Sequence, residues 1–184
     1  MVTVAAQADA SPPSPDASSR TGVLTPAPRQ AEPVGAPPGY VEMTVIGVAP
    51  TADGDAVLLT NVAKNVVVPI FVGGTEALSI QLRQRREHYQ RPLTHDLLDS
   101  IMHELGASLV KVHVDDIKNN TFLGTVFVRT GSRVFELDAR PSDAIALAIG
   151  NHVPIFVAQR VIDEAGIQKD PASNAPIPGT VPRI

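Results

Sequence analysis

A polar cluster stands at the start of an otherwise apolar segment near the end of the chain. The stretch ARPSDAIALA (139–148) places Arg140, Ser142 and Asp143 directly before a run of Ala, Ile and Leu. Pro141 suits the first turn of a helix, and Asp143 in that turn can accept hydrogen bonds from free backbone N–H groups. Capping does not account for Arg140, because a cation gains nothing at the positive end of the helix dipole. An Arg beside free N–H groups is a combination that binds phosphate.

Three interpretations of this cluster stay open from the sequence. Asp143 is a cap for the helix, or the partner of Arg140 in a buried ion pair, or part of a binding or catalytic site together with Arg140. Ser142 is better explained by helix entry than as a nucleophile, since no nucleophile-elbow motif surrounds it. The rest of the chain has to decide between a cap and a site.

A second polar set lies on the amphipathic stretch THDLLDSIMHELG, which we expect to form a helix that ends at Gly106. Helical spacing gathers the apolar side chains on one face: Leu97, Leu98, Ile101, Met102 and Leu105. On the opposite face, His95, Asp99 and His103 are spaced by four residues. Such a row could hold a divalent cation or orient an imidazole as a general base, but an ordinary solvated face has the same pattern.

His95 and Asp96 form the better candidate pair on this helix. Both lie in the first turn, where backbone N–H groups are free, and Thr94 can cap the helix.

Arginines are concentrated in the stretch QLRQRREHYQRP. Arg83, Arg85, Arg86 and Arg91 surround His88 and Tyr89. The group could grip a nucleic-acid backbone, with Tyr89 stacking on a base. It could equally be the positively charged end of a helix, where cations complement the dipole. The two interpretations are compatible.

Hydrophobic patterns elsewhere alternate between strand-like and helix-like segments. The predicted helices cover 75–87, 94–106 and 141–149. The predicted strands cover 40–49, 56–63 and 66–73, then SLVKVHVDDI, TFLGTVFVRT and RVFELDA, and finally VPIFV at 153–157. We expect an α+β fold, a single compact domain with a mixed, largely antiparallel sheet and about three helices.

The sequence also predicts turns between the strands and the direction of individual strand side chains. Asp53-Gly54 and Asn119-Asn120 should form hairpin turns, and Pro69 should lie near a sheet edge. In the last strand of the meander, Phe135 and Leu137 should point inward, with Glu136 and Asp138 outward. Lys111, His113 and Asp115 should line the solvent side of the sheet.

Composition divides the chain into a domain and two tails. Residues 1–39 hold 8 of the 17 prolines without hydrophobic periodicity, and we expect them to be disordered, like the short tail 170–184. The domain is then 40–169. No cysteine is present, so disulfides and thiolate metal sites are excluded.

Charge and hydropathy limit the class of protein further. The domain carries 12 Lys and Arg against 15 Asp and Glu, so any nucleic-acid contact must come from a local patch. The N-terminus lacks a signal-peptide pattern, and no apolar run is long enough to span a membrane. We expect a cytoplasmic protein without a membrane partner, and a homo-oligomer stays open.

Three motifs in one order resemble the bifunctional nuclease domain family. They are RPLTHDLL (91–98), NNTFLGTVFV (119–128) and ARPSDAIALA (139–148), followed by VPIFV, and the likeness runs from about Tyr40 to about Gly166. Members of this family are small bacterial and plant proteins credited with DNase and RNase activity. The resemblance implies a compact α+β domain whose substrates are DNA and RNA.

The resemblance gives the polar clusters provisional roles in phosphodiester hydrolysis. His95, Asp96 and Asp143 are the expected catalytic residues, and Asp96 and Asp143 are the expected ligands of a divalent cation such as Mg²⁺ or Mn²⁺. The other expected contacts are to phosphate (Arg91, Arg140 and Ser142) and to the nucleic-acid backbone (Arg83, Arg85 and Arg86). Both helix starts must then lie side by side. The alternative is a non-catalytic regulatory module that binds a small anion or a partner protein.

Overall fold

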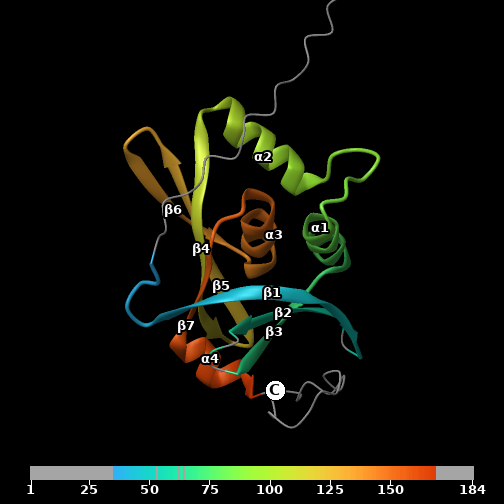
Figure 1. The fold of residues 1–184 in the computed structure, drawn as a ribbon, viewed down its shortest axis with the longest axis vertical. Coiled ribbons are helices and arrows are strands. Elements are labelled where there is room, and N and C mark those ends of the chain that lie inside the picture. The colour runs from blue at the N-terminus through green and yellow to red at the C-terminus, as the bar shows by residue number, and fades with distance from the viewer. Residues whose placement is uncertain (1–34, 53, 62, 64, 169–184) are drawn as a thin grey trace, which may run out of the picture.

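The central element of the fold is helix α3 (Pro141–Asn151), which is buried along most of its length. The structure is a computed structural model that describes residues 35–168 apart from 53, 62 and 64. Ala144, Ala146 and Ala148 are at most 1% exposed, and these small side chains let neighbouring elements approach closely. Helix α3 contacts two other helices and three strands, so it occupies the middle of the core (Figure 1).

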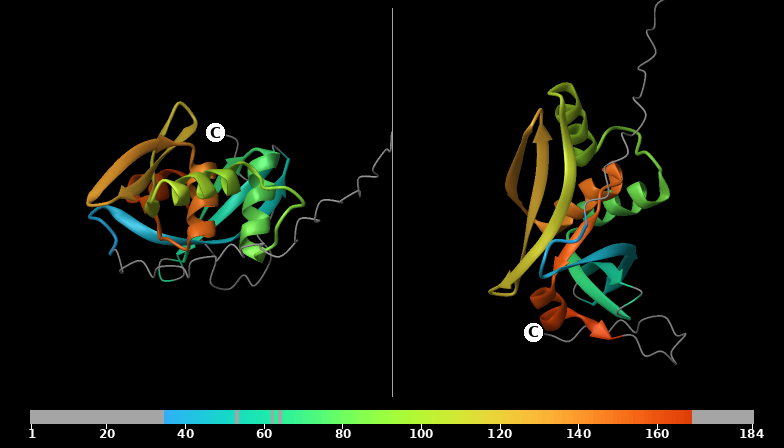
Figure 2. Two further views of the ribbon diagram at one scale, coloured as in Figure 1. Left: turned by 90° about the horizontal axis from the view of Figure 1, so that it is seen from above. Right: turned by 60° about the vertical axis from the view of Figure 1, so that its left-hand side comes forward.

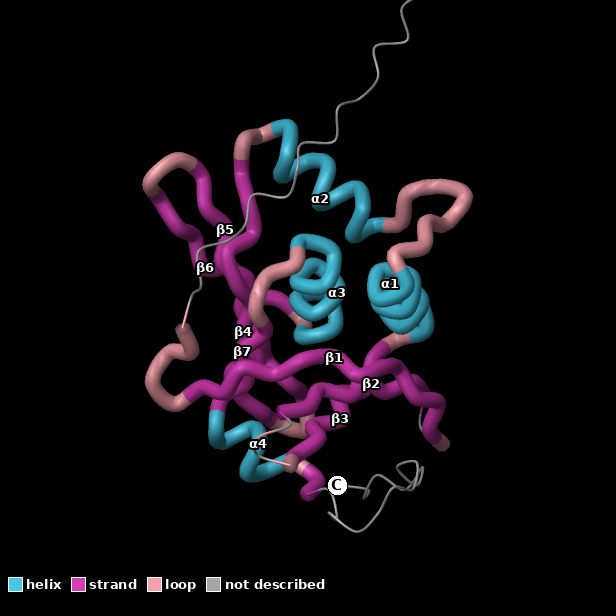
Figure 3. Tube along the Cα trace, viewed as in Figure 1, coloured by secondary structure: helices cyan, strands magenta, loops and turns pink. Residues whose placement is uncertain are grey.

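One eight-stranded sheet surrounds this helix, in the order β6-β5-β4-β7-β1-β2-β3-β8. The strands are β1 (Tyr40–Thr51), β2 (Gly54–Asn61), β3 (Val66–Val72), β4 (Ala107–Lys118), β5 (Thr121–Thr130), β6 (Arg133–Ala139), β7 (Ile155–Ala158) and β8 (Ile167–Gln168). Neighbours are antiparallel except for β4 and β7, which are parallel. The predicted α+β domain with a mixed, mostly antiparallel sheet is confirmed, and Figure 3 shows its helices and strands along the chain.

The remaining helices are α1 (Gly74–Arg85), α2 (Thr94–Glu104) and the short α4 (Gln159–Ala165). Helices α1, α2 and α3 lie on the same side of strands β4 and β5 (Figure 2). The sequence pattern missed α4 and β8, because elements of seven and two residues are too short to show a periodicity. None of the helices in the described part of the chain is long and apolar enough to cross a membrane.

The expected turn at Asn119-Asn120 and the expected edge position of Pro69 agree with the structure. Asn119 and Asn120 both adopt left-handed backbone angles, with φ of 49° and 63°, as a tight hairpin turn between β4 and β5 requires. Strand β8 pairs only with Val66 and Val67 of β3, so Pro69 lies beyond it at an open edge. Of the predicted tails, 1–39 and 170–184, residues 1–34 and 170–184 lie outside the described residues, and so does Asp53 of the first turn.

Helix α2 buries its polar face and exposes most of its apolar face, which is the reverse of most amphipathic helices. Met102 is buried, but the other apolar side chains are exposed: Leu97, Leu98, Ile101 and Leu105. The opposite, polar face packs against α1 and α3, and His95 is only 7% exposed. Thr94 is not the cap, because the residue before the helix is Leu93, whose N–H is bonded by the Asp96 side chain.

One expectation about strand faces holds in part and one is wrong. Phe135 and Leu137 of β6 point to the same side of the sheet as their partners Val128 and Val126, as predicted, but β6 is the edge strand, so these side chains remain 41% and 48% exposed. His113 is buried, although its pattern predicted the solvent side, because the rings of Tyr40, Phe127 and Phe156 surround it.

Gly124 lets the chain turn from β6 into α3. A Cβ at this position would lie 2.9 Å from the carbonyl oxygen of His113 and 3.1 Å from that of Ala139, and 3.5 Å from Cα of Pro141. Real Cβ atoms rarely approach backbone this closely. The glycine of the NNTFLGTVFV motif therefore makes room for the start of α3.

We predict that Gly124→Ala lowers the free energy of unfolding by about 1–3 kcal/mol, because backbone must shift to admit the methyl group. Gly74→Ala is the matched control: nothing lies within 4 Å of its Cβ position, and it is in a helix, where Ala is favoured. Urea denaturation of both variants measures the effect. Equal stability of the two variants would contradict the packing argument.

Candidate functional site

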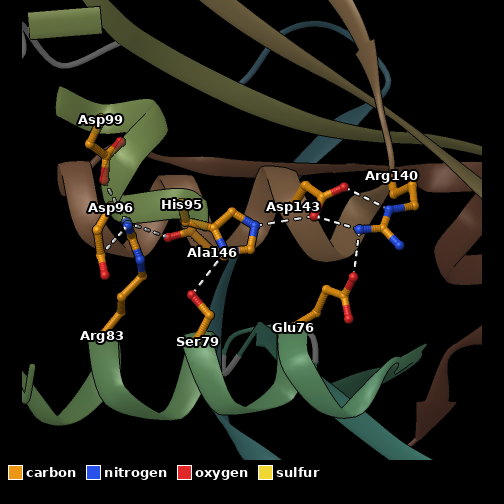
Figure 4. Close-up of polar contacts among 9 residues, drawn as sticks. All are labelled: Glu76, Ser79, Arg83, His95, Asp96, Asp99, Arg140, Asp143 and Ala146. Carbon is orange, nitrogen blue, oxygen red and sulfur yellow. Dashed lines mark hydrogen bonds and ion pairs between the residues drawn. The ribbon is translucent and has the colours of Figure 1, made fainter. Parts of the chain in front are cut away.

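Helices α1, α2 and α3 bring a row of polar side chains together between them (Figure 4). We call the following five residues the His95 cluster: Glu76, Ser79, His95, Arg140 and Asp143. The imidazole of His95 is at its centre, with Nδ1 2.9 Å from Oγ of Ser79 and Nε2 3.1 Å from Oδ1 of Asp143. An imidazole with its hydrogen on Nε2 fits both contacts, since it accepts from the Ser79 hydroxyl and donates to Asp143.

Arg140 forms the outer end of the His95 cluster. Its Nε donates to Oδ2 of Asp143 over 2.7 Å, and its Nη2 donates to Oδ1 of Asp143 over 2.9 Å and to Oε1 of Glu76. The Arg140 side chain is 67% exposed, and within the described part of the chain no partner takes the hydrogens of Nη1. Three bonds thus fix a guanidinium whose remaining N–H groups face outward.

Asp143 remains ionised under these bonds. Burial alone would raise its pKa, but the hydrogen bonds from Arg140 and His95 outweigh burial and hold the pKa of Asp143 below its ordinary value. The Asp143 side chain does not cap α3, and the exposure of Arg140 makes their ion pair a partly solvated one. The cap and the buried ion pair of the sequence analysis are therefore both wrong.

Arg83 holds the three helices together beside the His95 cluster. Its guanidinium lies 2.8 Å from the carboxylates of Asp96 and Asp99 on α2, and it donates to the carbonyl oxygen of Ala146 on α3 over 3.2 Å. A Cβ at Gly150 would fall 1.8 Å from Nη1 of Arg83, so only glycine leaves space for this contact.

The two predicted helix starts do meet. His95 in the first turn of α2 and Asp143 in the first turn of α3 are 48 residues apart in the sequence and in hydrogen-bonding contact in the structure. Asp96 lies on the far side of His95 from Asp143, with its carboxylate directed at Arg83 and at the N–H of Leu93 (Figure 4).

The residues named as metal ligands do not converge on a common point. The carboxylates of Asp96 and Asp143 are each bonded to a different arginine, and no group of three or more His, Asp or Glu side chains suited to a metal occurs among the described residues. The row of His95, Asp99 and His103 is also split, since Asp99 bonds Arg83 and Asn151 while His103 is exposed. This donor set does not fit a divalent cation.

The other predicted contact residues lie apart from the His95 cluster. Arg85, Arg86 and Arg91 are exposed, at the end of α1 and in the loop that follows it. Arg83 is not available to a nucleic acid, because its side chain is only 8% exposed and is engaged by α2 and α3. Ser142 is 7% exposed, within the buried first turn of α3.

Sequence reasoning missed the contribution of α1 to the site. Glu76, Ser79 and Arg83 are spaced by three and four residues and so share one face of α1, which packs on α3. That spacing was visible in TEALSIQLRQRRE, but the polar residues of a helix usually face solvent.

A second polar group lies away from the helices. Asp115 accepts hydrogen bonds of 2.7 Å from the hydroxyl groups of Tyr40 and Thr125, and Nδ1 of His113 lies 3.4 Å from it. Burial, together with the hydrogen bond to Asp115, raises the pKa of Tyr40 to about 12. These bonds fasten β1 to β4 and β5 and leave Asp115 only partly exposed.

We predict that Arg83→Met lowers the free energy of unfolding by about 1.5–3 kcal/mol, because hydrogen bonds to charged groups are lost at two aspartates. Arg85→Met, also in the last turn of α1 but exposed, should change it by no more than about 0.5 kcal/mol. Gly150→Ala should act in the same direction as Arg83→Met. The check is urea denaturation, and an Arg83→Met protein as stable as Arg85→Met would rule out the role of this contact.

The lowered pKa of Asp143 predicts a pH dependence of stability. The bonds to ionised Asp143 add their full contribution to the free energy of unfolding above the ordinary aspartate pKa of about 4. This contribution is lost as the pH falls through the lower pKa that Asp143 has in the folded protein. The stability advantage of the wild type over Asp143→Asn should therefore be largest near neutral pH and shrink below about pH 4. Denaturation of both proteins from pH 7 to pH 3 measures it. A difference that is constant or grows toward acid would contradict the assignment.

Comparison with known sequences agrees with this architecture. Residues 57–170 match the bifunctional nuclease domain, and the match includes all five residues of the His95 cluster. Two uncharacterized proteins of Mycobacterium tuberculosis, Rv1829 of strain H37Rv and MT1877 of strain CDC 1551 / Oshkosh, are each 34% identical over 129 residues, which cover 70% of this chain and 77% of theirs. The chain therefore belongs to the bifunctional nuclease domain family.

Proposed function

We propose that the chain is a nuclease that hydrolyses phosphodiester bonds of DNA and RNA at the His95 cluster. The observation that carries the proposal is the exposed guanidinium of Arg140, which Asp143 and Glu76 fix while Nη1 remains open. Phosphate oxygens are bound by such planar N–H donors. Membership of the bifunctional nuclease domain family supports the same substrate class.

In this proposal Arg140 binds a non-bridging phosphate oxygen through Nη1. A donor already held in place stabilises the negative charge that develops on the phosphate in the transition state without having to reorganise. Asp143 is 28% exposed and ionised, next to that donor. It is the group positioned to accept a hydrogen bond from the attacking water and orient it toward phosphorus.

His95 and Ser79 act through Asp143 and do not touch the substrate. Ser79 is 2% exposed, so its hydroxyl cannot reach a phosphodiester despite the contact with an imidazole. His95, at 7%, has both ring nitrogens engaged. They are positioning residues that fix the direction of the Asp143 carboxylate.

Arg85, Arg86 and Arg91 supply the remaining contact to the nucleic acid in this proposal. All three are exposed around the end of α1 and the loop before α2. Their charges favour a polyanion at this end of an otherwise acidic domain, and binding through them should weaken as salt rises. Arg83, which the sequence grouped with them, serves the packing of the helices instead.

The contacts also support a second candidate, a regulatory module that binds an anion without cleaving it. Every titratable group of the His95 cluster is paired in the ground state, and no three donors converge to hold a metal within the described residues. Such a module would use Arg140 for binding alone.

Cleavage assays on four proteins test both candidates. We expect the wild type to cleave labelled single- or double-stranded DNA or RNA, and Arg140→Met and Asp143→Asn to lose roughly 10²-fold or more of the rate. Arg129→Met, which removes an exposed cation on β5 outside the cluster, should retain the wild-type rate. Each assay is repeated with a chelator to test whether cleavage needs a metal ion. The described residues contain no group of donors suited to hold one.

The outcomes separate the candidates. Cleavage that persists equally in Arg140→Met and Asp143→Asn would come from a contaminant and refute the nuclease. Binding of labelled nucleic acid that needs Arg140 without any cleavage would establish the regulatory module instead. Melting temperatures of all four proteins show whether a loss of rate follows from unfolding.

A further inference from the structure

Helix α2 presents a row of apolar side chains to solvent. Leu97, Leu98, Ile101 and Leu105 are 56%, 40%, 45% and 72% exposed. Spacing by four places Leu97, Ile101 and Leu105 in one line along the helix. The polar face of α2 is fixed by Arg83 and Asp143, so the helix cannot roll to bury this row without breaking those bonds.

Strand β6 adds apolar surface on the same face of the sheet. Phe135 pairs with Val128 and Leu137 with Val126; Val126 belongs to the hydrophobic core and Val128 packs against it. Cross-strand partners point to the same side, so Phe135 and Leu137 also point toward the helix side. Val128 in turn pairs with Leu109 of β4, which follows α2 closely in the chain.

The edge of β6 is also free. It is the outermost strand of the eight-stranded sheet, and in the described part of the chain only β5 pairs with it. An exposed edge strand is a template for another strand, and natural monomers usually block such edges with charged side chains, lysine above all, with proline or with a bulge. Strand β6 has no lysine, proline or bulge within Arg133–Ala139; its carboxylates, Glu136 and Asp138, lie on the face opposite Phe135 and Leu137.

We propose that this surface, formed by Leu97, Leu98 and Ile101 of α2, by Leu105 directly after α2, and by Phe135 and Leu137 of β6, binds a second copy of the chain. Six large apolar side chains that are about half exposed present on the order of 500 Å² per copy. Two copies would bury about 1,000 Å² before the backbone of β6 is counted, which is about the minimum for a specific interface.

The two β6 strands pair antiparallel about a two-fold axis perpendicular to the sheet. That axis keeps the helices of both copies on one side of the joined sheet, and it allows only pairs in which both side chains point to the same face. A register centred on Glu136 would place two carboxylates opposite each other, which is unfavourable. The register centred on Phe135 avoids this, placing Phe135 opposite its own copy and Arg133 opposite Leu137.

A nucleic acid is a poorer occupant of the same surface. Helix α2 contains neither Lys nor Arg, and the one cation of β6, Arg133, lies over the ring of Phe135. Binding to a phosphate backbone needs several cations. An apolar, self-complementary edge fits a copy of the chain better.

The absence of cysteine from the chain makes a direct test possible. Sedimentation of the full chain at micromolar concentration and above should give the mass of two copies. Leu137→Lys and Leu105→Lys should shift it toward one copy, while Ile46→Lys, at a side chain 47% exposed on β1, should not. Under oxidising conditions Phe135→Cys should form a disulfide between copies, and Ile46→Cys should not.

A full chain that sediments as a single copy throughout would overturn the proposal, and the surface would then belong to another occupant. Dimers that persist in both lysine variants would overturn it as well, by placing the interface elsewhere. Equal cross-linking of Phe135→Cys and Ile46→Cys would refute the pairing of β6. Binding of single-stranded DNA by a wild type that sediments as one copy, lost in Leu137→Lys, would assign the surface to nucleic acid and refute the dimer.

Discussion

The attachment of α2 through its polar face is the constraint on which the rest of the structure depends. Arg83 on α1 bonds two aspartates of α2 and a carbonyl of α3, with glycine at position 150 leaving room for its guanidinium. The guanidinium is planar and carries five N–H groups, so one side chain can join three helices. A lysine has neither the geometry nor the number of donors. Once these bonds form, the imidazole of His95 is brought within reach of Asp143.

The same attachment has a consequence on the opposite side of the helix. A helix that uses its charged residues for packing must expose its apolar ones, because the two faces are about half a turn apart. The orientation of α2 therefore produces both the His95 cluster on one side of the helix and the exposed apolar row on the other. If the surface binds a second copy, the free energy of that contact also holds α2 in the position that the His95 cluster requires. The apolar surface would then stabilise the site without touching it.

The side chains of the His95 cluster become more exposed from one end of the row to the other. Ser79 and His95 are almost inaccessible, Asp143 is partly exposed and Arg140 is mostly exposed. The buried hydrogen bonds limit the carboxylate to one direction, and the carboxylate in turn limits the guanidinium. A proposed phosphate site of this kind needs few residues in contact with the ligand, since the inner residues fix the outer ones.

The sequence alone determined the fold class, most elements and the family, since these follow from periodicity, turn residues and ordered motifs. It also indicated that the polar starts of two helices would meet, because capping left Arg140 unexplained. It did not reveal Glu76 and Ser79, or that Arg83 is buried, since these contacts join residues distant in the sequence. Which face of α2 is buried, and that β6 lies at the exposed edge of the sheet, were likewise decided only by the tertiary structure. An amphipathic pattern gives the division of a helix or strand into two faces, but long-range ion pairs and the order of strands decide which face is buried.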